Sequence, residues 1–260
     1  MTRILLSGCL GRMGRAVREA AELSDGRFAV ISGVDPFASE GTILPFPVYT
    51  SVSEIPCGAE RPDVIVDFSH HSALPALLGY ATEAGIPVVV ATTGHTEEEL
   101  TQLHIASEKI AVFYSRNMSL GVNLLILLCK KASEVLGEDF DIEIIEKHHN
   151  KKLDAPSGTA LMLADAIKET FDGEKDYVYE RQSVRKARDK REIGIHAVRG
   201  GTIVGEHDVL FAGKDETVTL SHKATSREVF ATGALKASEY LPTKSAGLYD
   251  MNDLLKEVRL

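Results

Sequence analysis

Short apolar runs that alternate with helical segments constrain the fold of this chain more than any other feature of its first half. The continuous apolar character of the runs is typical of strands that are buried on both faces. The runs are Arg3–Ser7, Phe28–Val34, Val64–Phe68, Pro87–Thr92 and Ile110–Tyr114. The segments between them have helical spacing, notably Gly11–Leu23, Ala73–Ala84 and Glu97–Lys109. Because crossover helices join parallel strands, the pattern predicts a doubly wound α/β domain around a parallel sheet.

The pattern changes after Asn117, where apolar and polar residues begin to alternate. Helices are predicted over Val122–Leu136 and about Ser157–Glu169, and strands over Phe140–His149, Thr202–Ala212 and Glu216–Ala224. Alternation suits antiparallel pairing better than parallel pairing. Helical spacing returns over Arg227–Leu241 and Met251–Arg259, and these helices are expected to pack back on the first domain.

The length and composition bound the class of protein. With 260 residues, of which 44% are hydrophobic and 26% charged, the chain is long enough for one large domain or two modest ones. No stretch approaches the roughly 20 apolar residues of a membrane span, and the first residues lack the features of a signal peptide. We therefore expect a cytoplasmic protein with no membrane partner.

The cysteines and the net charge exclude further classes of site. Cys9, Cys57 and Cys129 form no CxxC pair, which favours free thiols over a disulfide framework or a zinc site. The formal net charge of -9 argues against a nucleic-acid partner. The one basic run, Arg181–Arg191, has no interleaved aromatic residues, and we predict a solvated loop there.

A glycine-rich stretch, SGCLGRMG, joins the first predicted strand to the first predicted helix. Gly8 can form the tight turn, Gly11 can let the backbone approach a pyrophosphate, and Gly14 can let the helix pack on the strand. The spacing is GxxGxxG instead of the commoner GxGxxG. Asp35 ends the second predicted strand at about the distance, roughly 20 residues, expected of a ribose-binding carboxylate. Together these features predict a dinucleotide-binding site.

Asp35 also predicts which dinucleotide is preferred. A carboxylate at this position hydrogen-bonds the ribose hydroxyls and repels a 2′-phosphate, so we expect NADH to be preferred over NADPH. Arg12 could turn toward a phosphate, which would make the preference modest. Cys9 lies where a helix terminus could lower the pKa of its thiol, but we interpret it as a small loop residue.

A second motif, EKHHNKKLDAPSGTA, begins at Glu146. The predicted strand before it ends near the histidines, and Ser157 is the predicted cap of the following helix. The backbone N–H groups of Gly158 and Thr159, with the positive end of the helix dipole, can hold a carboxylate. An acidic small molecule is therefore the predicted ligand.

Four basic side chains of the same motif add hydrogen-bond donors and positive charge: His148, His149, Lys151 and Lys152. Either a histidine near neutrality or a partly desolvated lysine could deliver a proton. A charged turn with a capped helix and no ligand stays open as an alternative on these residues alone. A metal site is disfavoured, because the histidines lack a partner at the usual spacing and the lysines would repel the ion.

Another histidine pair, His70–His71, follows the third predicted strand. It lies where a loop is expected to lead into a helix, and we interpret it as part of that loop and helix start.

Together, the motifs resemble those of the 4-hydroxy-tetrahydrodipicolinate reductase family, also called dihydrodipicolinate reductases. The resemblance spans nearly the whole chain. It includes, in order, GCLGRMG, VDFS, ATTGH, NMSLGVN, EKHHNKKLDAPSGTA, VRGGTIVGEH and SHKATSREVFATGALKA. The HH pair followed by KLDAPSGTA is close to diagnostic, whereas many nucleotide-binding families share the glycine loop.

The resemblance implies an oxidoreductase of lysine and diaminopimelate biosynthesis. Its members reduce 4-hydroxy-tetrahydrodipicolinate, a small cyclic dicarboxylate, to tetrahydrodipicolinate with NADH or NADPH and loss of water. The family pattern makes His148 the proposed proton donor and Lys152 the second catalytic residue. It assigns His149, Gly158 and Thr159 to substrate binding, and no residue to a metal.

The resemblance also maps the nucleotide contacts onto this chain. The positions are Gly8, Cys9, Leu10, Gly11, Arg12, Met13, Asp35, Ala91, Thr92, Thr93, Ser115, Arg116, Asn117 and Met118. Two departures from the family pattern bear on cofactor contacts. Ser115 and Arg116 stand where alanine or proline is commoner, and Ala91 stands where glycine is frequent.

The fold that the resemblance implies agrees with the pattern of strands and helices. It is a Rossmann-type doubly wound parallel sheet over residues 1–118, completed by 229–260. Residues 119–228 form a second α/β domain with a mixed, largely antiparallel sheet, which binds substrate and assembles a homotetramer. A nucleotide-binding redox sensor that has lost catalysis is the alternative, but such a protein would tolerate decay of the second motif, which stands complete here.

Overall fold

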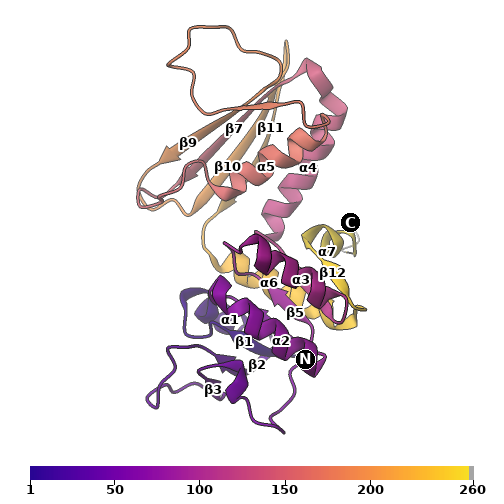
Figure 1. Cartoon of the computed structure of the whole chain (residues 1–260). Coiled ribbons are helices and arrows are strands. Elements are labelled where there is room, and N and C mark those ends of the chain that lie inside the picture. Colours follow the sequence, from indigo (N-terminus) through magenta and orange to yellow (C-terminus); the bar gives the residue numbers. More distant parts are fainter. Residues whose placement is uncertain (258–260) are drawn as a thin grey trace. The chain divides into compact units, whose positions relative to one another are not determined.

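The computed structural model describes residues 1–257 and divides the chain into two compact units (Figure 1). Unit 1 combines residues 1–120 with the segment that starts at Arg227, and unit 2 is Gly121–Ser226. Residues 258–260, which end the predicted segment 229–260 and include the last two residues of the predicted helix Met251–Arg259, lie outside the described residues. Within residues 1–257, no helix has both the length and the apolar character required to cross a bilayer.

Unit 1 is built on a seven-stranded parallel sheet with the order β12-β6-β5-β4-β1-β2-β3. The strands are β1 (Thr2–Ser7), β2 (Phe28–Val34), β3 (Val48–Tyr49), β4 (Val64–Asp67), β5 (Val88–Val90), β6 (Ala111–Tyr114) and β12 (Gly247–Tyr249). Alternate residues of β1 face two different cores: Ile4 and Leu6 lie in one, and Leu5 lies in the other. The central strands β1, β4 and β5 are mostly apolar because both of their faces are buried over most of their length.

Helices cover both faces of this sheet, so the predicted doubly wound architecture is confirmed. They are α1 (Arg12–Glu22), α2 (Leu74–Ala84), α3 (Glu97–Ser107), α6 (Glu228–Tyr240) and α7 (Met251–Glu257). Residues of α1, α6 and α7 pack in the core that contains Ile4, whereas residues of α2 and α3 pack in the core that contains Leu5. The C-terminal segment therefore completes the first unit.

Unit 2 contains a five-stranded sheet with the order β11-β10-β7-β9-β8. Its strands are β7 (Asp141–His148), β8 (Asp176–Val178), β9 (Glu192–Arg199), β10 (Gly205–Ala212) and β11 (Thr217–Ala224). Strand β10 pairs antiparallel with β7 and β11, whereas β9 pairs parallel with β7 and β8. The predicted mixed sheet is confirmed, but antiparallel pairing holds only on the β10 side.

Strand β9 was not predicted, and Gly194 explains why. A glycine in the interior of a strand weakens the sequence pattern. Here a Cβ on Gly194 would lie 1.8 Å from Glu143 Oε2 on the neighbouring strand, so the side chain of Glu143 occupies that space. The glycine is a consequence of packing across the sheet, which a single strand's pattern does not reveal.

Helices α4 (Leu120–Leu136) and α5 (Gly158–Glu169) lie over one face of this sheet (Figure 1). Strand β7 alternates strictly, with Ile142, Ile144, Glu146 and His148 buried on the helix-covered face. Apolar residues fill that face along most of the strand and pack with α4 and α5. The two buried polar residues of β7 therefore come at its carboxyl end, where the apolar core stops.

The basic run Arg181–Arg191 is a loop, as predicted, but it is not simply solvated. Arg188 lies 2.8 Å from Asp141 and 3.0 Å from Glu143, and its side chain is only 16% exposed. Arg181 pairs with Glu143 at 2.7 Å and also with Glu192. Carboxylates on β7 and β9 form ion pairs with these arginines and hold them against the sheet. The charges of the loop and of the strands therefore compensate each other.

Candidate functional site

The glycine loop between β1 and α1 has the geometry of a phosphate-binding turn. Gly8 has a φ of +77°, and a Cβ there would lie 2.6 Å from the Phe68 carbonyl oxygen. A Cβ on Gly14 would lie 2.2 Å from the Gly8 carbonyl oxygen. Gly11 caps α1 without a side chain, so the first-turn N–H groups receive no side-chain cap. Those N–H groups and the positive helix end suit a pyrophosphate.

Asp35 follows β2 directly and is tied to the glycine loop. One of its carboxylate oxygens accepts a hydrogen bond from the Leu10 amide at 2.9 Å, and the other accepts one from the Phe37 amide at 3.1 Å. The residue is only 4% exposed. Because each carboxylate oxygen can accept more than one hydrogen bond, Asp35 is fixed in place with capacity left for hydroxyl donors.

The remaining predicted nucleotide residues follow β5 and β6, at the same carboxyl edge of the sheet. The Thr92 hydroxyl donates to Asp67 Oδ2 at 2.7 Å, which links the loop after β5 to the end of β4. The Ser115 hydroxyl donates to the Asn117 carbonyl at 2.8 Å within the loop after β6. Ligands of open α/β sheets bind at this edge. The residues present therefore fit a dinucleotide.

Exposure divides the predicted nucleotide residues into two kinds. Arg12, Thr93 and Arg116 are exposed, so their side chains are available to a ligand. Cys9 and Met118 are buried in the core of unit 1 and can contribute only through their backbone. Burial raises the pKa of the Cys9 thiol to about 11, which agrees with its interpretation as a small loop residue.

In unit 2, the carboxyl end of β7 carries a buried polar network centred on Glu146. This carboxylate has no exposed surface and lies 2.6 Å from His148 Nδ1. Two nitrogens of Arg199 donate to its two oxygens, each at 2.7 Å, and the Ser157 amide donates at 2.9 Å. Burial alone would raise the pKa of Glu146, but the hydrogen bonds from these three partners lower it to about 2. Glu146 is therefore ionised at neutral pH.

The loop after β7 returns to this network through Ser157. The Ser157 side chain accepts a hydrogen bond from the Ala160 amide and so caps α5, as predicted. It also lies 3.1 Å from His207 Nε2. Arg199 donates to the Asp154 carbonyl at 2.7 Å, which fixes the middle of the loop. The predicted capped helix start is thus held directly against the end of β7.

The structure places the predicted substrate and catalytic residues around this helix start. His148 is buried, with 8% exposure, at the end of β7. The side chain of Lys152 is 21% exposed and pairs with Asp154 at 2.8 Å. Gly158 and Thr159 form the first turn of α5, and His149 follows His148 at the strand end. These residues belong to unit 2, whereas all the predicted nucleotide residues belong to unit 1.

Three residues of the network were not predicted: Glu146, Arg199 and His207. His207 lies on the same buried face of β10 as Val209, and its ring centre is 5.3 Å from that of His148. Burial, with the nearby charge of His148, lowers the pKa of His207 to about 4, so it is neutral at pH 7. A signal was present for Glu146 and His207, because both are polar residues at inward positions of alternating strands, where buried polar groups need partners. No such signal was present for Arg199, because β9 does not alternate.

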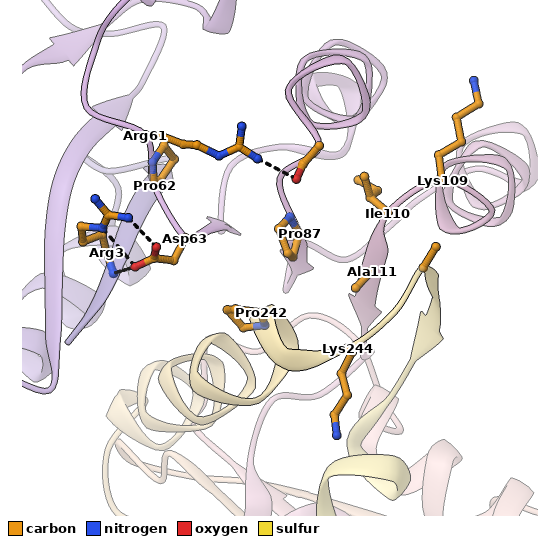
Figure 2. Close-up of a pocket in the computed structure, with 12 residues that line it drawn as sticks. Arg3, Arg61, Pro62, Asp63, Pro87, Lys109, Ile110, Ala111, Pro242 and Lys244 are labelled. Atoms are coloured by element: carbon orange, nitrogen blue, oxygen red, sulfur yellow. Dashed lines mark hydrogen bonds and ion pairs between the residues drawn. The ribbon is translucent and has the colours of Figure 1, made fainter.

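A hollow of about 420 Å³ lies at the opposite, amino-terminal edge of the unit 1 sheet. Three of its four cations already have partners, the first two being Arg3, which pairs with Asp63 at 2.7 Å, and Arg61, which donates to the Gly85 carbonyl at 3.0 Å (Figure 2). Lys244 pairs with Glu257, and Lys109 extends away from the other residues of the lining. Because ligands of such sheets bind at the carboxyl edge, this hollow is separate from the candidate site. Among residues 1–257, no cluster of histidine, cysteine and carboxylate side chains forms a metal site.

Comparison with known proteins decides the family. Residues 2–118 match the family model described as dihydrodipicolinate reductase, N-terminus, and residues 121–255 match dihydrodipicolinate reductase, C-terminus. The chain belongs to the dihydrodipicolinate reductase family. The resemblance found in the sequence is confirmed, and the match covers both units.

Relatives and a solved structure agree with this assignment. A 4-hydroxy-tetrahydrodipicolinate reductase from Caldanaerobacter subterraneus subsp. tengcongensis is 52% identical over 99% of both chains. Another from Clostridium novyi is 46% identical over 98% of this chain and 99% of its own. The structure of a dipicolinate-bound dihydrodipicolinate reductase from Paenisporosarcina sp. TG-14 superposes with a TM-score of 0.80 at 25% identity. That comparison covers 97% of this chain and 99% of the other.

Proposed function

We propose that this protein catalyses the pyridine-nucleotide-dependent reduction of 4-hydroxy-tetrahydrodipicolinate to tetrahydrodipicolinate, with loss of water. The observation that carries the proposal is the end of β7. There a buried histidine held by an ionised carboxylate is followed by a lysine and by the start of α5, where the positive end of the helix dipole favours an anion. The family shares this activity among its named relatives. A nucleotide sensor without catalysis would have no use for so complete a set of proton donors and anion ligands.

The reaction requires one hydride and one proton, and the substrate hydroxyl leaves as water. A nicotinamide cofactor, held by the glycine loop and Asp35, would supply the hydride. His148 and Lys152 are the groups of this chain that can supply the proton and balance the negative charge that the hydride brings. His148 is buried at the strand end, whereas Lys152 is partly exposed on the loop beside it. We assign both to catalysis.

The start of α5 is proposed to bind a substrate carboxylate. Ser157 caps the helix through the Ala160 amide, and the positive end of the helix dipole at Gly158 and Thr159 favours an anion there. His149 lies at the adjacent strand end and is assigned to orienting the ring. The dipicolinate bound to the Paenisporosarcina enzyme is a small dicarboxylate, in agreement with this class of ligand.

NADH is proposed as the preferred cofactor. Asp35 is held by two backbone amides beside the glycine loop, and its fixed negative charge would repel a 2′-phosphate. Arg12 is exposed at the start of α1 and is the cation that could offset this repulsion. In Asp35→Ala, we expect the ratio of kcat/KM for NADH to kcat/KM for NADPH to fall. An unchanged ratio would remove Asp35 as the basis of selectivity.

A homotetramer assembled through the unit 2 sheet is proposed as the working form. The face of the sheet that α4 and α5 leave uncovered carries the half-buried apolar residues Ile145 and Leu210 on neighbouring strands. Lys147 and Asp208 pair at 2.8 Å on the same face. A face of mixed apolar and charge-paired residues suits a subunit interface. Sedimentation should give a tetramer, and Ile145→Arg should dissociate it; a monomeric wild type would contradict this assembly.

Enzyme assays test the proposed activity directly. Purified protein should oxidise NADH only when the freshly made product of the preceding synthase is present, because no other electron acceptor is available. The control is the same mixture without the synthase. No turnover with either cofactor would refute the proposed function.

A further inference from the structure

His148 has two ring nitrogens, and the structure distinguishes what each of them does. Nδ1 lies 2.6 Å from Glu146 Oε2. An ionised carboxylate can only accept hydrogen bonds, so Nδ1 must carry the hydrogen. Arg199 donates to both oxygens of Glu146, which keeps this carboxylate charged and opposes transfer of the Nδ1 proton to it. Nε2 is therefore the nitrogen left to gain or lose a proton.

The space next to Nε2 depends on a glycine. A Cβ on Gly205 would lie 3.1 Å from His148 Nε2, closer than to any other atom of the ring. Gly205 has no positive φ, so backbone conformation does not require glycine at this position. The ring cannot move away freely, because Glu146 holds its other edge and the ring of His207 lies 5.3 Å away. The missing side chain is what keeps Nε2 clear.

We infer that Nε2 of His148 is the proton-donating atom, that Glu146 is the positioning residue that fixes this tautomer, and that Gly205 keeps the approach to Nε2 open. This inference rests on the proposed function for the identity of the reaction. The arrangement of donor, carboxylate and glycine does not depend on which substrate is bound. In neutral His148 the proton then resides on Nδ1, which is the less common tautomer of histidine.

Nitrogen NMR of histidine-labelled protein tests the tautomer without any assay. At about pH 9, where histidines are ordinarily neutral, His148 should show a protonated Nδ1 and an unprotonated Nε2; its signals are assigned by their loss in His148→Asn. In Glu146→Gln, the neutral amide no longer dictates the tautomer, and we expect a shift toward a protonated Nε2. A protonated Nε2 in the wild type would overturn the inference, whether or not the protein turns over substrate.

Glu146→Gln leaves Arg199 without its partner and could fail to fold. The double variant Glu146→Gln with Arg199→Met removes both charges and should fold, because replacing a whole buried pair is tolerated better than breaking it. The same tautomer shift is expected in the double variant. Retention of the Nδ1 proton in the double variant would show that Glu146 does not position the ring.

Gly205→Ala tests access to Nε2 separately. The added methyl group should lower kcat by roughly 10²-fold, the size of a lost proton-transfer contribution, while KM for NADH and the NMR tautomer stay unchanged. Gly79→Ala is the matched control, since a Cβ at Gly79 meets no atom within 4 Å and the residue lies in α2 of unit 1, whereas the network belongs to unit 2. Full kcat in Gly205→Ala would overturn the access role. Absence of turnover in the wild type would instead refute the proposed function and leave the tautomer result standing.

Discussion

The chain contains two pairs of consecutive histidines, His70–His71 and His148–His149. The two pairs differ in the burial and in the partners of the glutamate to which each is bonded. In each pair, one histidine is hydrogen-bonded to a glutamate: His71 to Glu99 at 2.9 Å, and His148 to Glu146 at 2.6 Å. Glu99 keeps 12% of its side chain exposed and also caps α3 through the Thr96 amide. Glu146 is fully buried and is matched by Arg199. The same dipeptide therefore lies at a helix start in one unit and contains the candidate proton donor in the other.

The difference lies in what each glutamate does. Glu99 belongs to a capping box, in which it and Thr96 satisfy each other's backbone amides, so its bond to His71 is an addition to a local motif. Glu146 has only long-range or network partners, and a charge without exposed surface must be compensated there. A histidine pair is thus informative about function only together with the burial of its partner.

The largest expected effect separates the two pairs by activity. His148→Asn should lower kcat by roughly 10²–10⁴-fold, because it removes the proposed proton donor. The kcat of His71→Asn should stay within about twofold of wild type, since His71 lies at a helix start and its hydrogen bond to Glu99 joins it to a capping box. Steady-state kinetics with NADH and fresh substrate measure both. Equal reductions of kcat in the two variants would contradict a functional difference between the two pairs.

Removing the cation that compensates Glu146 should produce the next largest effect. Arg199→Met leaves a buried carboxylate without its bidentate partner and should cost about 3 kcal/mol of unfolding free energy. In the first pair, Glu99 lies 2.9 Å from His71 and 3.6 Å from His95, and His71→Ala should cost less than about 1 kcal/mol because Glu99 keeps its Thr96 bond. Denaturant unfolding monitored by circular dichroism compares them. If the unfolding free energy falls no more in Arg199→Met than in His71→Ala, the buried charge of Glu146 does not require Arg199 for compensation.

Mild acid, between pH 6.5 and about 4, should destabilise the network around the second histidine pair. The pKa of His207 falls from 6.5 to about 4 on folding, so between these values the unfolded state binds more protons than the native state. The stability that this group contributes is fully present above pH 6.5 and is lost as pH falls toward 4. Between pH 7 and pH 5 the loss should be about 2 kcal/mol.

The variant His207→Gln checks this assignment, because its amide can still bond Ser157 but does not titrate. The fall in unfolding free energy from pH 7 to pH 5 should be smaller in the variant than in wild type. Parallel pH dependence in the two proteins would assign the loss to other groups.

A smaller effect is expected at the helix cap that supports the first pair. Thr96→Ala removes the side chain that accepts from the Glu99 amide and should cost about 1 kcal/mol of unfolding free energy. Thr96→Ser keeps the hydroxyl and serves as the control. If alanine is as stable as serine at this position, the capping box does not hold Glu99.

The smallest effect is expected at His70. Its side chain is exposed and caps only a short 3-10 turn at His71–Ala73. His70→Ala should change the unfolding free energy by less than about 0.5 kcal/mol and leave kcat unaltered. A larger loss by either measure would mean that the first pair contributes more than a helix start.

Several elements of the fold were predictable because one local pattern determines each of them. The strands β1, β2, β4, β5 and β6 are continuous apolar runs, and burial on both faces leaves no other stable arrangement. The edge strands β3 and β12 were not predicted, because they are short and only partly buried, so no continuous apolar run marks them. The arginines of the 181–191 loop were predicted to be solvated, since their carboxylate partners lie on strands far away in sequence.

The candidate site divides in the same way. The glycine loop, Asp35 and the Ser157 cap follow from spacing, because a turn or a helix start is decided by residues that adjoin in sequence. Glu146 lay inside the recognised motif, yet its role was not predicted. Its partner Arg199 is on another strand, and only the pairing of β7 with β9 brings them together.

By itself, then, the sequence determined the family, the parallel nucleotide-binding unit and the residues around the second histidine pair, because these depend on local periodicity and on contiguous motifs. The tertiary structure alone decided which nitrogen of His148 faces Glu146, why position 205 is glycine, and that His207 is neutral. These properties arise from distances between strands and from desolvation. Both are fixed only when segments remote in the chain pack against each other.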